Sequence, residues 1–376
     1  MNQGPWGRSP VLTAEQNERL TRVGPATPMG RLLRRYWHPI AAQAELDDVP
    51  VKAVRILGED LVLFRDGSGN HGLVQRRCPH RGFDLSYGIS QPEGLRCMYH
   101  GWRFDAQGRC LERPFEDARC PGGRGADQVR LLHYPVQPLS GLIWAYLGPE
   151  PVPLLPHWEP FGWENGFRHV FFCEIPCNWF QCQENSIDPV HFEWLHLNWL
   201  RHLHAPQEPP AARHLRLCFE EFEYGFRYGR LVEGQSEQDE AWRIGRVCLW
   251  PNGLYTGLNF SWRVPCDDER PLAFHLVSAP VPLDRVPFRQ RRIPYSWIPI
   301  RDEKGNWVVT DVVHQDLTAL AAQGTVADRQ REQCCHTPAE QGRQYEHQVG
   351  RTGRNQLGPF RRQRRAKPDC RALPGC

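Results

Sequence analysis

Two short segments, each carrying one cysteine and one histidine, constrain this chain more than any other feature. The first reads Cys78-Pro-His80, and the second, after 16 intervening residues, reads Cys97-Met-Tyr-His100. A zinc ion is the obvious alternative ligand, but zinc modules usually pair cysteine with cysteine and histidine with histidine. Segments that mix the two suit a two-iron cluster, in which one iron takes both thiolates and the other iron takes both imidazoles.

The residues around these segments favour the cluster. Gly82 and Gly101 would let the backbone pass close to it without a clash from a Cβ atom. Tyr99 and backbone amides could hydrogen-bond to sulfur and tune the reduction potential. The segments CPHRGFDLSYG and CMYHGWRFDAQG resemble the two cluster-binding loops of the Rieske family. By this resemblance, the ligands of a [2Fe–2S] cluster are Cys78, His80, Cys97 and His100.

A second group of potential metal ligands follows in the segment 178–196, NWFQCQENSIDPVHFEWLH. Asp188 and His191 are three residues apart, so a helix would place them on one face. His191 and His196 are five residues apart, which overshoots a regular turn. Both can face one metal only if the helix is loosened, and Pro189 favours such an irregularity. Taken alone, the pair could equally be two hydrogen-bonded histidines on a half-buried helix.

This segment resembles the iron-binding helix of Rieske oxygenases, especially those of the phthalate dioxygenase-like branch. The resemblance implies that His191 and His196, together with a later aspartate, bind ferrous iron as a facial triad that leaves positions open for oxygen. Asp188 matches the acidic residue that bridges to a Rieske histidine of the neighbouring subunit. Glu184 lies where other branches often carry asparagine, and we include it with Asp188 among the catalytic candidates.

The third iron ligand must come from a distant segment. Residues 312–332 read VVHQDLTALAAQGTVADRQRE and resemble the family segment that has a QD pair, then QG, then DR. Asp316 of the QD pair is the preferred ligand, Asp311 is the second choice and Asp328 is the third. An isolated aspartate can equally be a solvated surface residue or a helix cap.

The pattern of the first half predicts a helical N-terminal lead-in over 1–44, in which a short helix near residue 29 ends in a turn at Pro39. An all-β Rieske domain is expected over 45–150, because β-prone runs alternate with glycine-containing turns. These runs cover residues 51–56, 60–65 and 142–147.

A proline-rich linker over 149–160 leads into the second half, and residues 151–332 are expected to form the catalytic domain. A helical segment near 179–200 and strand-like runs over 243–250, 254–264 and 273–280 predict an antiparallel sheet. The fold class is therefore α+β, and by resemblance the second domain is of the helix-grip, START-like type.

Composition excludes several classes of protein. With 46 Lys+Arg against 43 Asp+Glu, the formal charge of +3 is too near neutral to indicate a nucleic-acid binder. No apolar run approaches the roughly 18 residues of a membrane span, and the polar first ten residues point to a cytoplasmic protein with reduced cysteines. The segment 333–376 departs from the family, because it is rich in Arg, Gln and Cys and poor in aliphatic residues. It is expected to be a disordered or frameshifted tail.

The resemblance implies a terminal oxygenase that uses O2 and two electrons to hydroxylate, dihydroxylate or oxidatively demethylate an aromatic or cyclic substrate. Electrons would come from a reductase, with or without a ferredoxin, so NAD(P)H would act only indirectly. They would reach the iron through His80 or His100 and Asp188 within a homotrimer. The alternatives are a Rieske electron-transfer protein or an inactive homologue. Candidates for the substrate pocket, which could equally be sheet core, are Trp250, Leu254, Tyr255, Leu258, Phe260 and His275.

Overall fold

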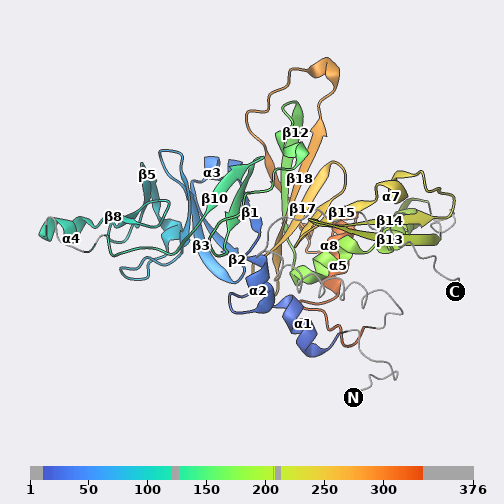
Figure 1. Ribbon diagram of the computed structural model, residues 1–376, viewed down its shortest axis with the longest axis horizontal. Coiled ribbons are helices and arrows are strands. Elements are labelled where there is room, and N and C mark those ends of the chain that lie inside the picture. The colour runs from blue at the N-terminus through green and yellow to red at the C-terminus, as the bar shows by residue number, and fades with distance from the viewer. Residues whose placement is uncertain (1–11, 121–124, 126, 206, 208–212, 333–376) are drawn as a thin grey trace.

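The computed structural model describes residues 12–120, 125, 127–205, 207 and 213–332 (Figure 1). The predicted tail at 333–376 lies outside these residues. Crossing a bilayer takes a helix of about 20 apolar residues, and none of the helices in the described ranges has that length and character.

The described strands of the N-terminal half form three small antiparallel sheets. The first joins, in spatial order, β1 (Trp37–Ala42), β11 (Leu142–Tyr146) and β10 (Val136–Leu139). The second joins β2 (Val51–Ile56), β3 (Glu59–Arg65), β4 (His71–Gln75) and β9 (His133–Tyr134). The third joins β5 (Ile89–Gln91), β6 (Gly94–Arg96), β7 (Arg103–Phe104) and β8 (Cys110–Glu112).

Short helices precede or connect these strands. They are α1 (Ala14–Thr21), α2 (Pro28–Leu33), α3 (Gln43–Asp48), η1 (Leu85–Tyr87) and α4 (Pro114–Arg119). The helix α2 begins where Thr27 accepts the amide of Gly30 and Pro28 occupies the first turn, as expected for a capped start. The predicted turn at Pro39 is wrong: Pro39 lies within β1, opposite Trp144 of β11. Six consecutive buried residues of β1 explain this, because that strand is covered on both faces.

The C-terminal half is built on one eight-stranded sheet, which confirms the predicted fold class. Its spatial order is β13 (His214–Phe222), β14 (Gly225–Val232), β15 (Arg246–Leu249), β16 (Gly253–Tyr255), β17 (Asn259–Pro265), β18 (Pro271–Pro280), β12 (Gly166–Glu174) and β19 (Tyr295–Trp297). Neighbouring strands are antiparallel except β12 and β19, which run parallel.

The two faces of this sheet pack against different partners. On β17, Phe260 and Trp262 point to the outer face, where the ring of Trp262 lies 5.0 Å from that of Trp144 in β11. The alternate residues point to the inner face, because successive side chains of a strand alternate. Ala273 of β18 belongs to that inner face and packs with Leu317, so helices cover it.

The helices of the C-terminal half are η2 (Glu159–Gly162), α5 (Trp179–Ile187), η3 (Phe192–Asn198), α6 (Trp199–His204), α7 (Glu240–Arg243), η4 (Leu283–Arg285) and α8 (Val312–Ala322). The predicted helical segment near 179–200 is confirmed, with an interruption before η3. α5 is capped by Asn178, whose side chain accepts the amide of Phe180. In Figure 1, α5 and α8 lie on one side of the sheet of β1, β11 and β10, and the sheet of β5–β8 lies on the other.

Candidate metal centres

The two Cys/His segments form loops that close in the same way. The amide of Cys78 donates to the carbonyl of Phe83 at 2.9 Å, and the amide of Gly82 donates to the carbonyl of Cys78 at 2.8 Å. The second loop repeats both bonds, at 2.8 and 2.9 Å, through the equivalent residues Cys97, Gly101 and Trp102. Gly82 and Gly101 have φ angles of +69° and +76°, a left-handed conformation in which a side chain would be strained.

The four side chains of the loops fit a [2Fe–2S] cluster. Cys78 and Cys97 are 3% and 2% exposed, and the rings of His80 and His100 lie with their centres 4.5 Å apart. Nδ1 of His80 is buried without a hydrogen-bond partner among the described residues, as a nitrogen that awaits a metal would be. Burial raises the pKa of Cys78 to about 11, and the adjacent Cys97 adds to this effect. Two such thiolates need the positive charge of a metal beside them.

One edge of this site reaches the surface. His100 is exposed, and the neighbouring side chains of Met98 and Tyr99 are 57% and 56% exposed. The ring of His80 is instead stacked on Trp102 at 4.8 Å. One of the two histidines is therefore accessible to another protein, which suits a centre that exchanges electrons.

The second centre begins where α5 ends. Its last residue, Ile187, is followed by Asp188 and Pro189, and a residue before proline is disfavoured in helical conformation. The chain then resumes as η3, which is a π-helix. In a π-helix each amide bonds to the residue five positions earlier, so residues five apart come onto one side. The predicted loosening of the helix is thus confirmed, and it brings His191 and His196 together with ring centres 5.2 Å apart.

The helix α8 brings a carboxylate to the two imidazoles. Oδ1 of Asp316 lies 3.5 Å from Nε2 of His191 and 3.3 Å from Nε2 of His196. One ligand atom from each of the three residues can be chosen so that all lie within 4.8 Å of one another. Two imidazoles and one carboxylate on one side of a site form the donor set that ferrous iron takes in facial-triad oxygenases.

The charges of this triad are tightly linked. Burial works to lower the pKa of His191, but the carboxylates of Asp188 and Asp316 outweigh it and raise that pKa to about 9. Burial likewise works to raise the pKa of Asp316, but the two imidazoles hold it well below its usual range. Positive charge beside Asp316 is therefore favoured, whether a proton or a metal ion supplies it.

Two residues that the sequence analysis missed hold the triad in place. Oε1 of Gln315 lies 2.9 Å from Nδ1 of His196, and Nε2 of Gln315 donates to the carbonyl of Val309 at 3.2 Å. Because the amide of Gln315 is oriented by Val309, its oxygen accepts the hydrogen of Nδ1 of His196, so in the neutral imidazole Nε2 is the nitrogen left to bind a metal. Asn185 donates to Oδ1 of Asp316 at 3.1 Å.

Both missed residues were adjacent to residues already singled out. Gln315 is the first residue of the QD pair, and Asn185 follows Glu184 directly. The sequence did offer one signal for Asn185: it lies three residues before Asp188, and this spacing on a helix indicates a shared face. Nothing in the sequence shows that α5 and α8 pack together, so the contact of Asn185 with Asp316 had no sequence signal.

Asp188 lies beside the triad at the surface. Its Oδ1 accepts the amide of Val190 at 2.7 Å, and its Oδ2 lies 3.7 Å from Nδ1 of His191, which is beyond hydrogen-bond range. The side chain is 41% exposed. The carboxylate therefore keeps acceptor capacity for a group from outside this chain.

Glu184 has a different environment. Its two carboxylate oxygens accept from Nε and Nη2 of Arg329, at 2.8 and 2.5 Å. Arg329 is 1% exposed, its guanidinium lies over the ring of Phe180, and it also donates to the side chain of Asn17. The pair ties α5 to the chain after α8. A catalytic role of Glu184 stays a prediction.

The two fallback aspartates lie in other environments. Asp311 is the N-cap of α8: its Oδ1 accepts the amides of Val313 and His314. Asp328 pairs with Arg331 at 3.2 Å and is 46% exposed. Of the three candidates, the structure brings Asp316 to the histidines.

The residues predicted to line a substrate pocket are divided between the two faces of the sheet. Phe260 and Leu254 belong to the core cluster that includes β11, and Trp250 and Tyr255 pack against that cluster. Leu258 is 51% exposed. His275 lies on the inner face, opposite Ser261 of β17 and Phe171 of β12. Most of these candidates are thus sheet core, which was the alternative kept open for them.

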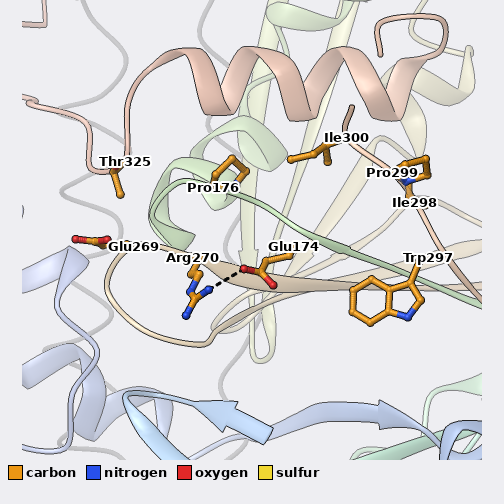
Figure 2. A pocket seen from close by; sticks show the side chains of 9 residues that line it. All are labelled: Glu174, Pro176, Glu269, Arg270, Trp297, Ile298, Pro299, Ile300 and Thr325. Atoms are coloured by element: carbon orange, nitrogen blue, oxygen red, sulfur yellow. Dashed lines mark hydrogen bonds and ion pairs between the residues drawn. The ribbon is translucent and has the colours of Figure 1, made fainter. Parts of the chain in front are cut away.

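An open cavity of about 870 Å³ lies elsewhere, between α8, β19 and the start of β18 (Figure 2). Figure 2 shows the ion pair between Arg270 and Glu174 in its lining, with the two atoms 3.0 Å apart. The triad residues are not part of its lining. The cavity and the triad are therefore separate sites.

Comparison with known proteins identifies the relatives of this chain. Residues 36–134 match the Rieske [2Fe–2S] domain. The chain is 51% identical over 322 residues to the oxygenase subunit of 5,5'-dehydrodivanillate O-demethylase from Sphingobium sp., covering 86% of this chain and 76% of that one. It is 33% identical over 298 residues to the phthalate 4,5-dioxygenase oxygenase subunit of Pseudomonas putida, covering 71% and 64%. The fold is shared with dicamba monooxygenase bound to 3,6-dichlorosalicylic acid, at a TM-score of 0.58, 16% identity and coverage of 87% and 99%.

A Rieske domain joined to a catalytic domain that carries a His/His/Asp triad defines an oxygenase component. The chain belongs to the oxygenase subunits of the Rieske non-heme iron oxygenase family. The predicted family and enzyme class are confirmed, and the relatives include the phthalate dioxygenase subunit that represents the predicted branch.

Proposed function

We propose that this oxygenase subunit oxidatively removes O-methyl groups from methoxylated aromatic acids. The observation that carries the proposal is the 51% identity to a subunit named for O-demethylation, against 33% to one named for ring dioxygenation. The balanced reaction converts an aryl methyl ether, O2, two electrons and two protons into a phenol, formaldehyde and water. A ferrous ion held by the triad would supply the site of O2 activation.

The side chains of the triad would have distinct tasks. His191, His196 and Asp316 would hold the metal on one side and leave the opposite side for substrate and O2. Gln315 would keep Nε2 of His196 free of a proton, because it accepts the hydrogen of Nδ1. The amide of Asn185 would hold Oδ1 of Asp316 toward the histidines.

Cys78, His80, Cys97 and His100 would hold the [2Fe–2S] cluster that receives electrons. A reductase would supply them, with or without a ferredoxin, and NAD(P)H would act only on that partner. The exposure of His100 and Tyr99 supports an encounter with another protein at this edge.

We further propose that the working unit is a ring of subunits, a homotrimer, in which Asp188 links two copies. In Figure 1 the sheet of β5–β8 lies apart from α5 and α8, and the second cluster loop joins β6 to β7 of that sheet, so the cluster and the triad of one chain are separated. The side chain of Asp188 is 41% exposed and has free acceptor capacity, and the tryptophans that follow in the same segment, Trp194 of η3 and Trp199 of α6, are 65% and 40% exposed. A second copy that covers these rings and places His100 against Asp188 accounts for both features.

The proposed reaction is tested by reconstitution with a surrogate reductase. Methoxylated benzoates, including 5,5'-dehydrodivanillate, should give formaldehyde and the corresponding phenol, with one O2 consumed per formaldehyde. The Asp316→Ala variant is the control, and it should release none. Formation of a cis-diol without formaldehyde would contradict the proposal and indicate ring dioxygenation instead of demethylation.

A further inference from the structure

The inner face of the catalytic sheet carries an arginine, Arg263, that is half-buried. Nη1 of Arg263 is buried and has no hydrogen-bond partner among the described residues. Among the described residues no ion pair or side-chain hydrogen bond reaches this guanidinium; burial lowers its pKa, and the charge of the triad residue Asp316 acts in the opposite direction. The buried Arg329, by contrast, is neutralised by Glu184.

The strand register places Arg263 next to the triad. Arg263 of β17 lies opposite Ala273 of β18, and Ala273 lies opposite Cys173 of β12. Ala273 and Cys173 both pack with Leu317 of α8, which directly follows the triad residue Asp316. Because paired residues of neighbouring strands share a face, Arg263 points to the side of the sheet that α8 covers.

The alternate residues of β17 before Arg263 are polar and uncharged, and the carboxylate whose charge acts on Arg263 on this face is that of the triad residue Asp316. Two residues earlier on β17, Ser261 is hydrogen-bonded to Nδ1 of His275 at 2.9 Å. Burial lowers the pKa of His275 to about 3, and the charge of Arg263 adds to that shift, so the imidazole is neutral at pH 7. Asn259, two residues earlier again, has a buried Oδ1 without a described partner. This side of β17 therefore presents one cation and several hydrogen-bonding groups toward the helices.

An unpaired buried cation is costly. Removing a charge from water without a partner costs several kcal/mol, and arginine does not escape the cost by losing its proton. Burial lowers the pKa of Arg263, which is the direction of a destabilised charge. The cost is offset when an anion enters and accepts hydrogen bonds from the guanidinium, in the bidentate geometry that suits a carboxylate.

We propose that Arg263 anchors the substrate by binding the carboxylate of an aromatic acid on the inner face of the sheet, beside the iron triad. The inference rests on the proposed function and names the residue that would select acids over neutral substrates. Arg263 is in this sense a specificity-determining residue, because a neutral analogue would leave its charge buried and unpaired.

The large open cavity is not an alternative site for the carboxylate. Its arginine, Arg270, already has two carboxylate partners: Glu174 at 3.0 Å, which Figure 2 draws, and Asp267 at 3.3 Å. Arg270 is also half exposed, at 49%, so water screens its charge. Arg270 therefore provides a matched control: a strand-flanking arginine of the same sheet whose charge is already neutralised.

The test compares acids with their neutral esters. Binding of 3-methoxybenzoate, of 3-methoxy-4-hydroxybenzoate and of the two corresponding methyl esters is measured by calorimetry on the iron-loaded holoenzyme. The wild type should bind each acid on the order of 10- to 100-fold more tightly than its ester, which is the range expected for a hydrogen bond to a charged group. Arg263→Met should abolish this preference, Arg263→Lys should retain part of it, and Arg270→Met should retain all of it.

A second measurement separates anchoring from a structural role. Without ligand, Arg263→Met should unfold at an equal or higher urea concentration than the wild type, because it removes an unpaired buried charge. The proposal is overturned if Arg263→Met keeps the preference for acids, or if the wild type shows none for either pair. Formaldehyde release from the acids by the wild type, with no effect of Arg263→Met on the preference, would reject the anchor and retain the demethylase. A preference for acids that depends on Arg263, with a cis-diol as the product, would retain the anchor and reject the demethylase.

Discussion

The two metal centres of this chain are constructed in opposite ways. The cluster loops are each closed by bonds between residues at most five positions apart, and one histidine lies at the surface. The triad joins His191 and His196 to Asp316, which follows 120 residues after His196, and His196 is 1% exposed. A centre that exchanges electrons with a partner can be local and exposed, whereas a centre that must exclude water needs packed elements around it.

The largest expected effect separates the two centres completely. Cys97→Ser should eliminate the cluster, because a thiolate ligand is lost, while the triad keeps its iron. Iron content should fall from about three to about one per chain, and the visible colour and the Rieske electron paramagnetic resonance signal should disappear. Loss of the triad iron as well would show that the two centres do not form independently.

The reverse experiment removes the triad and spares the cluster. Asp316→Ala should lose the mononuclear iron and reduce turnover to background, because one of three protein ligands is gone. The cluster spectrum should be unchanged. Metal analysis and formaldehyde release measure the two effects, and full activity in this variant would refute the assignment of Asp316.

The connection between the centres is tested at Asp188. Asp188→Asn should keep both metals, because Asp188 is not a proposed ligand, yet lower turnover by roughly 100-fold, the upper range for residues that orient metal ligands. Stopped-flow oxidation of the reduced cluster, with substrate and O2 present, measures the step directly. Normal oxidation, or full activity of a monomer in sedimentation, would argue decisively against the bridge between subunits.

A smaller effect is expected at Gln315, because it orients the metal ligand His196 and does not itself bind the metal. Gln315→Leu removes the acceptor for Nδ1 of His196 and should weaken iron binding by about 10- to 100-fold. Excess ferrous iron should restore turnover, and Gln315→Glu should bind iron better than the leucine variant because it still accepts the hydrogen. An unchanged dissociation constant would leave Gln315 without a role in metal binding.

The smallest effect belongs to Asp311, the control for Asp316. Asp311→Ala removes the N-cap of α8 and should lower the free energy of unfolding by about 1 kcal/mol. Turnover per folded subunit should stay unchanged. Urea denaturation and activity measure the two quantities, and loss of iron in this variant would mean that the two aspartates have been assigned the wrong way round.

How far the sequence predicts this molecule depends on the distance over which each feature is decided. The strand over 51–56 was predicted to the residue, because alternation and flanking turns are local signals. The π-helix followed from the five-residue spacing of His191 and His196. The strand around Pro39 was missed, because its burial on both faces depends on β11, more than a hundred residues later.

The sequence by itself determined the cluster loops, since two ligands, a glycine with positive φ and the closing bonds all fall within six residues of chain. Only the tertiary structure decided which of Asp311, Asp316 and Asp328 faces the histidines, because that depends on how α8 packs against α5 and η3. It also decided that Arg263 faces the helices while Trp262 faces the Rieske strands. Alternation predicts that two neighbours on a strand point to opposite faces, but the packing of the sheet between its two covering layers assigns each face its environment.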